Sequence, residues 1–300
     1  MYDIIVIGAG PAGLCAAIYG CRAGKSVLLM EKNGFGGQMT FSPKMENYPG
    51  FTSVSGSELA DKMVSQAISQ GTEVEFAEAT KITKTEGGFL VDTDTGSFLG
   101  LSVIVAVGAR HRTLGVEGEA SLIGNGVSFC AVCDGAFYAG QHVCVIGGGN
   151  SALQEALQLA ENCSKITVLQ NLDRLTGEGR LVEAVLRNPK IEVIYGATVT
   201  KFVGKGELNG VQYSKDGENI LLPVKGAFVA IGLIPEADKF ADIINTDERG
   251  CAIAGENCHT SHMGIFVAGD CRTKTVRQVS TAIADGACAA LAACEYLENL

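Results

Sequence analysis

The sequence predicts an α/β protein with two Rossmann-like dinucleotide-binding folds, each with a parallel sheet and a β-meander. A glycine-rich loop follows an apolar strand at residues 8–13, and the same order recurs at residues 147–152. In both places a helical stretch and a second apolar strand come next. This order places a pyrophosphate at a helix N-terminus. We therefore expect an internal repeat of two nucleotide-binding folds in one chain.

The composition limits the classes of partner. With 300 residues the chain is long for one core and sufficient for two domains. Its net charge of −10 argues against a nucleic-acid surface. No apolar run approaches the roughly 18 residues that a membrane span needs. We therefore expect neither nucleic-acid binding nor membrane insertion.

The cysteine content and the first residues indicate a reducing cytoplasm. The 11 cysteines are odd in number and irregularly spaced, unlike a secreted disulfide framework. A strand is expected directly after Met1, which is not typical of a signal peptide. In the cytoplasm, a disulfide is more often catalytic than structural.

The first glycine loop, which also contains Pro11 and Ala12, has a mechanical role for each glycine. Gly8 makes the tight turn, Gly10 lets the backbone approach a pyrophosphate, and Gly13 lets helix and strand pack closely. The flanking elements are a strand at 3–7, a helix at 14–24 and a strand at 27–30. Glu31 ends that second strand, where an acid accepts hydrogen bonds from ribose hydroxyls.

The remaining elements follow from periodicity and from turn residues. An amphipathic helix is predicted over 57–70, between loops at 36–38 and 46–51 and a later stretch of short strands. The other expected elements are a β-meander at 73–99, strands at 103–108, 142–146, 165–169, 227–232 and 264–270, helices at 153–161 and from 280 to Glu298, and a second meander at 191–224.

A Cys-x-x-Cys pair followed by an acid lies just before the second loop, at Cys130, Cys133 and Asp134. This spacing suits a redox disulfide or a reactive thiolate. Half of a zinc site has the same spacing, but such a site needs a second pair. Cys251, Cys258 and His259 come nearest to one and lack the pair spacing, so we favour the redox interpretation.

Taken together, these residues resemble the low-molecular-weight thioredoxin reductases over essentially the whole chain. The placement of Cys-x-x-Cys-Asp before the second loop is specific, because related flavoprotein disulfide reductases carry the pair near the first loop. The matching stretches are GAGPAG (8–13), GGQM (36–39), ENYPGF (46–51), GVSFCAVCDGAFY (126–138), VIGGGNSA (145–152), VAIG (229–232), GIFVAGD (264–270) and RQV (277–279).

The resemblance implies a discontinuous FAD-binding domain, 1–112 plus 240–300. An inserted domain, 113–239, would carry the redox disulfide and a nicotinamide nucleotide. The FAD site is expected to comprise Gly8, Gly10, Pro11, Ala12, Gly13, Glu31, Gln38, Asn47, Gly108, Gly269, Asp270, Arg277, Gln278 and Val279. The nicotinamide site is expected to comprise Gly147, Gly149, Asn150, Ser151, Ala152 and Gly232.

The resemblance also implies a homodimer that passes electrons to thioredoxin, with an inserted domain that rotates between two poses. In this interpretation Cys133 faces the flavin and Cys130 attacks the thioredoxin disulfide. Thiol–disulfide exchange needs a thiolate and a proton for the leaving sulfur. Asp134 would supply that proton if partial burial raises its pKa, and the alternative is a turn or cap residue.

The chain departs from the family in the pocket for the 2′-phosphate of NADPH. NADPH users carry a histidine and arginines there, whereas the corresponding slots here hold Gln170, Asn171, Leu172 and Thr176. Nearby Arg174 and Arg180 would compensate, and Asp173 and Glu178 would oppose them. NADPH, NADH and reduced ferredoxin therefore remain open as electron donors.

Two alternative functions remain. A redox-sensing, nucleotide-binding flavoprotein would share the glycine loops without turning over thioredoxin, and the intact Cys-x-x-Cys-Asp argues against it. An alkyl hydroperoxide reductase-type flavoprotein would carry an additional thioredoxin-like region before the FAD strand, and here that strand is expected at the first residues.

Overall fold

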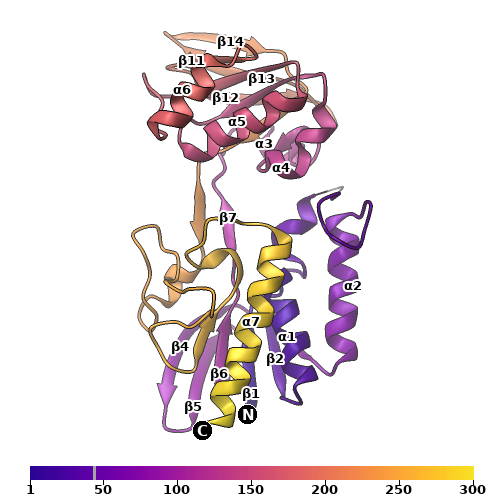
Figure 1. Ribbon diagram of the computed structural model, residues 1–300, viewed down its shortest axis with the longest axis vertical. Helices are drawn as coiled ribbons and strands as arrows, with labels where there is room; N and C mark the ends of the chain where they lie inside the picture. The colour runs from indigo at the N-terminus through magenta and orange to yellow at the C-terminus, as the bar shows by residue number, and fades with distance from the viewer. Residues whose placement is uncertain (43–44) are drawn as a thin grey trace. The chain divides into compact units, whose positions relative to one another are not determined.

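The computed structural model describes residues 1–42 and 45–300 (Figure 1). The chain divides into two compact units: Met1–Arg110 with Ile234–Leu300, and His111–Leu233. Each unit has its own mainly parallel sheet and packed helices, which confirms the expected α/β class. Within the described ranges, none of the helices is both long enough and apolar enough to cross a bilayer.

The first unit is built on a seven-stranded sheet. The strands that pair in parallel are β1 (Tyr2–Ile7), β2 (Val27–Glu31), β3 (Glu73–Phe76), β6 (Ser97–Val105) and β17 (Ile265–Val267). The antiparallel strands β4 (Ala79–Thr85) and β5 (Gly88–Thr93) extend the sheet beyond β6.

The sequence-based prediction of a meander at 73–99 and a separate strand at 103–108 was wrong at β6. It is one continuous strand, because its first part pairs with β5 and its last part pairs with β1 and β17. It ends at Val105, so Gly108 lies in the loop beyond it with a left-handed φ of 69°.

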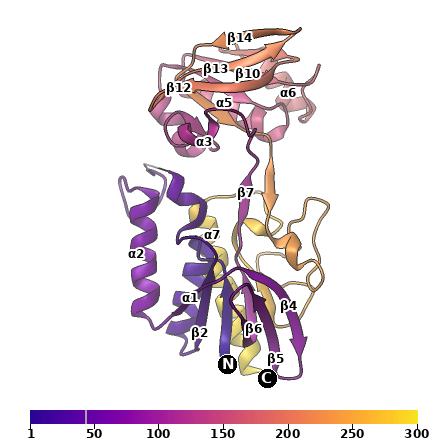
Figure 2. The same cartoon turned by 180° about the vertical axis from the view of Figure 1, so that it is seen from behind.

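Three helices cover one face of this sheet, namely α1 (Pro11–Arg22), α2 (Gly56–Ser69) and α7 (Val279–Glu298). Side chains alternate along β1, so Ile4 and Val6 pack toward these helices. Ile5 and Ile7 pack on the other face with η3 (Ala237–Phe240) and the loop after it. Figure 2 shows the sheet from behind, with α7 on the far side of the strands. Helix α7 runs beside α1.

The second unit repeats the plan with a five-stranded parallel sheet. Its strands are β8 (Val127–Ser128), β9 (His142–Ile146), β10 (Lys165–Gln170), β11 (Ile191–Tyr195) and β15 (Gly226–Val229). Helix α5 (Asn150–Asn162) packs on the face that carries Val143 and Val145. The antiparallel sheet β12–β14 (Thr198–Gly204, Leu208–Lys215, Glu218–Leu222) packs on the other face.

The structure adds elements that the sequence did not predict. The segment 191–224 is not one meander, because β11 joins the parallel sheet and only β12–β14 form the antiparallel one. The segments that join the units pair as a two-stranded sheet, β7 (Ala109–His111) with β16 (Leu233–Pro235). The added helices are α3 (Glu119–Leu122), α4 (Ala131–Asp134), α6 (Gly179–Arg187), η1 (Gly37–Phe41), η2 (Gly135–Tyr138) and η4 (Gly269–Cys271).

Candidate functional site

The first glycine loop connects β1 to α1, and its glycines differ in what surrounds them. A Cβ on Gly8 would lie 2.6 Å from the Ala106 oxygen, and one on Gly13 would lie 1.8 Å from the Gly8 oxygen. These two glycines are therefore required by the fold itself. A Cβ on Gly10 would meet no atom within 4 Å, so the space over Gly10 is open to a ligand.

The start of α1 is suited to an anion. Gly10 is the N-cap and supplies no side-chain cap, and Pro11 follows in the first turn. The main-chain N–H groups of a first turn have no partner within the helix. They are therefore available to a diphosphate, with the helix dipole in the favourable sense.

Glu31 lies at the end of β2, as predicted, and binds the loop itself. Its Oε2 accepts a hydrogen bond from the Ala9 amide at 2.8 Å. Its Oε1 accepts one from the Asn33 amide at 2.9 Å. A carboxylate oxygen has more than one acceptor position, so both oxygens retain capacity for ribose hydroxyls.

The turn after β17 brings Asp270 to the same region. Gly269 has a φ of 82°, and a Cβ there would lie 2.9 Å from the Ala12 Cβ, so the turn packs on the start of α1. Asp270 is partly buried, and its buried Oδ1 has no hydrogen-bond partner among the described residues. Burial raises the pKa of Asp270, and the charges of Lys274 and Arg277 oppose that rise.

The other residues expected for FAD lie in the same unit. The Gln38 side chain donates to the Ala109 carbonyl, and the Asn47 side-chain amide donates to Gln278 Oε1 at 3.2 Å. Gln278 caps α7, which starts at Val279. Arg277 Nε is buried without a partner in the described chain.

These residues fit FAD. A glycine cradle at a helix N-terminus suits a diphosphate. Asp270 offers an unpartnered acceptor, and Arg277 offers an unpartnered donor. Buried polar atoms rarely remain without partners, so a polar ligand is the expected complement of both.

The cysteine pair forms a disulfide in the second unit, with Cα atoms of Cys130 and Cys133 5.3 Å apart. The two sulfurs are bonded to each other rather than free as metal ligands. Cys130 is the N-cap of the short helix α4, and Cys133 lies within it. Val132, between them, is 59% exposed, so the pair lies at the surface of its unit.

Asp134 is linked to this pair through Ser128, a residue that the sequence analysis did not identify. The Ser128 hydroxyl donates to Asp134 Oδ2 at 2.6 Å and accepts from the Cys130 amide at 3.1 Å. The other carboxyl oxygen, Oδ1, is buried with no partner among the described residues. Burial raises the pKa of Asp134, although the Ser128 hydrogen bond opposes the rise.

The sequence analysis did not identify His111 either. It lies beside Phe129, the residue that precedes Cys130. Its ring stacks on Phe129, with centroids 4.9 Å apart. Burial lowers the pKa of His111 to about 4, so the ring is neutral at pH 7. The sequence signal was weak, because a single histidine 18 residues before Phe129 forms no motif.

The second glycine loop connects β9 to α5 and repeats the first in its backbone. A Cβ on Gly147 would lie 2.5 Å from the Ala230 oxygen, while one on Gly149 would find its nearest atom, Thr176 Oγ1, at 3.8 Å. Gly149 caps α5 without a side-chain cap, as Gly10 caps α1. Asn150, Ser151 and Ala152 form the first turn of α5, and Gly232 takes a φ of 105°.

The loop after β10 folds over this second cradle. Gln170 is 4% exposed, and its amide lies against Gly148, where a Cβ would come within 2.5 Å of it. The Thr176 amide donates to the Gly148 carbonyl at 2.8 Å. The Glu178 amide donates to Asn150 Oδ1 at 2.7 Å, and the Asn150 side chain donates back to Glu178 Oε1 at 3.1 Å.

The cations near this cradle are exposed. Arg174 Nη1 lies 3.8 Å from Asp173 Oδ1, and their side chains are 76% and 90% exposed. Asn171 and Leu172, which stand where arginines would grip a 2′-phosphate, are also exposed. The cradle for a diphosphate is thus present, and the arginine pair expected at its 2′-phosphate position is replaced by neutral side chains.

Comparisons with known proteins agree with this geometry. Residues 2–286 match the family described as pyridine nucleotide-disulphide oxidoreductase. The chain is 40% identical to a thioredoxin reductase of Treponema pallidum, with 100% of this chain and 98% of that protein covered. The chain belongs to the thioredoxin reductase family.

Other relatives support the same membership. A thioredoxin reductase of Listeria monocytogenes is 38% identical over 100% of this chain and 95% of its own length. The crystal structure of thioredoxin reductase from Streptococcus pyogenes superposes with a TM-score of 0.96 at 37% identity, covering 100% and 99% of the two chains. Members of this oxidoreductase family use FAD and a nicotinamide nucleotide.

Proposed function

We propose that this protein is a thioredoxin reductase that passes electrons through FAD and the Cys130–Cys133 disulfide to thioredoxin. The observation that carries the proposal is the disulfide with its adjoining Ser128–Asp134 link, in a chain that also holds a dinucleotide cradle. FAD supplies the acceptance of a hydride and the delivery of two electrons. Relatives bearing the name thioredoxin reductase match the full length of the chain.

The protein residues then carry out a balanced exchange. In the reduced pair, the Cys130 thiolate attacks one sulfur of the thioredoxin disulfide, and the other thioredoxin sulfur leaves with the bonding electron pair. The Cys133 thiolate next attacks Cys130 Sγ, which re-forms the disulfide and releases the second thioredoxin thiolate. Asp134 provides a proton for a leaving sulfur, because partial burial raises the pKa of its carboxyl.

We assign FAD to the residues predicted for it in the first unit and the nicotinamide nucleotide to the second cradle. We further propose a cytoplasmic homodimer. The neutral residues at the 2′-phosphate position support weak use of NADPH with little preference over NADH. A low-potential protein such as reduced ferredoxin is then the better donor.

Turnover with a chemically reduced flavin tests the function without depending on the donor. The FAD-loaded protein, reduced by dithionite or light under anaerobic conditions, should reduce thioredoxin disulfide catalytically. Variants C130S and C133S should retain FAD and lose this turnover. Intact FAD with no thioredoxin turnover in the unmodified protein would favour the redox-sensing alternative instead.

Trapping of thioredoxin tests the roles of the two cysteines. Cys133→Ser leaves Cys130 free, so it should form a stable mixed disulfide with a thioredoxin that lacks its resolving cysteine. Cys130→Ser leaves Cys133 free and should form much less. The reverse pattern on a non-reducing gel would exchange the two roles.

A further inference from the structure

A buried carboxylate on α7 organises the turn that carries Asp270. Asp285 is 5% exposed and is surrounded in sequence by alanine, glycine and cysteine. Burial of a carboxylate costs free energy unless the group is paired and hydrogen-bonded. The retention of an acid at this position therefore depends on the partners that it holds.

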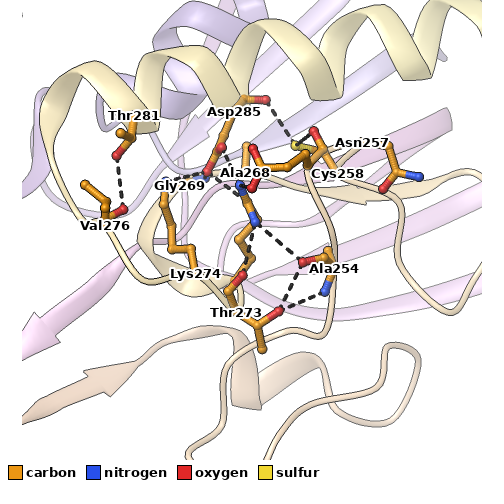
Figure 3. A network of polar contacts seen from close by, with 12 residues as sticks. Ala254, Asn257, Cys258, Ala268, Gly269, Thr273, Lys274, Val276, Thr281 and Asp285 are labelled. Carbon is orange, nitrogen blue, oxygen red and sulfur yellow. Dashed lines mark hydrogen bonds and ion pairs between the residues drawn. The ribbon is translucent and has the colours of Figure 1, made fainter.

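Those partners all come from the segment directly after β17. Asp285 Oδ2 accepts from the Gly269 amide at 3.0 Å and from Lys274 Nζ at 2.8 Å (Figure 3). The Arg272 guanidinium donates to both carboxylate oxygens, at 3.0 and 2.8 Å. One side chain from α7 thus fastens the turn and the chain beyond it.

The two cations in this cluster differ in their other contacts. Arg272, whose side chain is 2% exposed, also donates to the carbonyl oxygens of Ala254 and Thr273. It therefore ties a neighbouring loop to the turn. Lys274, whose side chain is 6% exposed, hydrogen-bonds within the described residues to Asp285 alone.

Two cations share the Asp285 carboxylate, and Arg272 also pairs with the exposed Glu256 at 3.4 Å. Although burial opposes it, hydrogen bonds from Arg272 and Lys274 hold the pKa of Asp285 below its ordinary value, so the carboxylate is ionised. The charge of Lys274 also opposes the rise in the pKa of Asp270 that burial causes. Asp270 is the acid with the unpartnered oxygen.

We propose that Asp285 and Lys274 are positioning residues for FAD: Asp285 fixes the Gly269–Asp270 turn through the Gly269 main-chain amide, and Lys274 holds the Asp285 oxygen that accepts from this amide. The proposal rests on the FAD site of the proposed function. It gives Arg272 a mainly structural role, because that side chain also holds the loop at Ala254. Lys274 is the member whose removal leaves the Arg272–Asp285 pair intact.

Titration of FAD into FAD-depleted protein, followed by quenching of flavin fluorescence, tests this. Lys274→Met should weaken FAD binding about tenfold, the size of one charge-assisted contact. The melting temperature of the FAD-free protein should change little, because Arg272 and the Gly269 amide still hydrogen-bond to Asp285. Lys274→Arg should recover most of the affinity. The matched control is Glu256→Gln, which removes an exposed partner of Arg272 at 3.4 Å and should bind FAD normally.

Two results would overturn the inference. One is equal FAD affinity in K274M and E256Q. The other is a fall in the melting temperature of FAD-free K274M that accompanies its loss of affinity, because this would indicate a structural role only. Failure of the unmodified protein to bind FAD would instead overturn the proposed function together with the inference.

Discussion

The two glycine loops have the same backbone and different surroundings. In the first unit, the acid at the end of the second strand, Glu31, hydrogen-bonds to the loop and retains capacity for a ribose. In the second unit the corresponding strand ends in Gln170, a neutral side chain buried against Gly148. The repeat thus has a glycine loop of the same backbone form in each unit, while the residue at the end of the second strand differs.

This difference separates what a fold requires from what a ligand requires. Gly8 and Gly147 would each place a Cβ within 2.6 Å of a backbone oxygen, so both are fixed by packing. A Cβ on Gly10 would meet no atom within 4 Å, and one on Gly149 would make only an ordinary contact with Thr176 Oγ1 at 3.8 Å, so packing does not require either residue to be glycine. The residues at the strand ends, Glu31 and Gln170, adjoin the two loops, and there the two units have diverged.

The largest effect is expected from substitution of Gly10, where a Cβ would meet no protein atom within 4 Å. Gly10→Val should fold normally and lose FAD almost completely, because its side chain would fill the space for the diphosphate. Gly149→Val is the matched control in the second loop, and it should remain yellow while it loses reduction by nicotinamide nucleotides. The flavin absorbance of the purified proteins gives the result, and a fully yellow G10V protein would refute the assignment of the first cradle.

A smaller effect is expected at the acid beside the disulfide. Asp134→Asn should lower thioredoxin turnover about 10²-fold, the low end of general acid contributions. Burial raises the pKa of Asp134, so the protonated form survives to higher pH than for an ordinary carboxyl. Turnover should therefore fall as pH rises through that pKa, and D134N should lack this limb. An unchanged pH profile in D134N would assign Asp134 to a turn role only.

A gain of function is expected at the second cradle. Arg residues at 171 and 172 should improve NADPH use about tenfold or more, since each charge-assisted contact to phosphate contributes roughly 1.5–3 kcal/mol. NADH use should change little, because NADH lacks the 2′-phosphate. Anaerobic flavin reduction by each nucleotide measures this, and equal gains with both would show that the arginines act without contacting the phosphate.

Much of the fold followed from local pattern. Each glycine loop follows a short apolar strand and precedes a helix, so the two folds and helix α2 were predictable from neighbouring residues. The continuity of β6 was not, because it depends on pairing with β17, which lies over 150 residues away. Helix α4 is one turn long and contains the cysteine motif, so it has no periodicity of its own.

The site shows the same division. The cysteines, the glycines and Asp270 lie in recognisable stretches. Ser128 and His111 are linked to the site only by contacts that no motif encodes. Asp285 was detectable in one respect, because it is the one charged residue among the first 16 of α7. Its partners Arg272 and Lys274 precede it by 13 and 11 residues and lie outside α7, so their contact with Asp285 is visible only in the structure.

The most direct measurement is anaerobic reduction of the FAD-loaded protein by NADPH, NADH and reduced ferredoxin in parallel. The second cradle carries the neutral side chains of Asn171 and Leu172 at the predicted 2′-phosphate position, so we expect slow reduction by NADPH that is insensitive to salt and similar to that by NADH. Reduced ferredoxin should reduce the flavin faster than either nucleotide. Saturation by micromolar NADPH with NADH far behind would contradict this account and would show that a nearby arginine, such as Arg174 or Arg180, binds the phosphate.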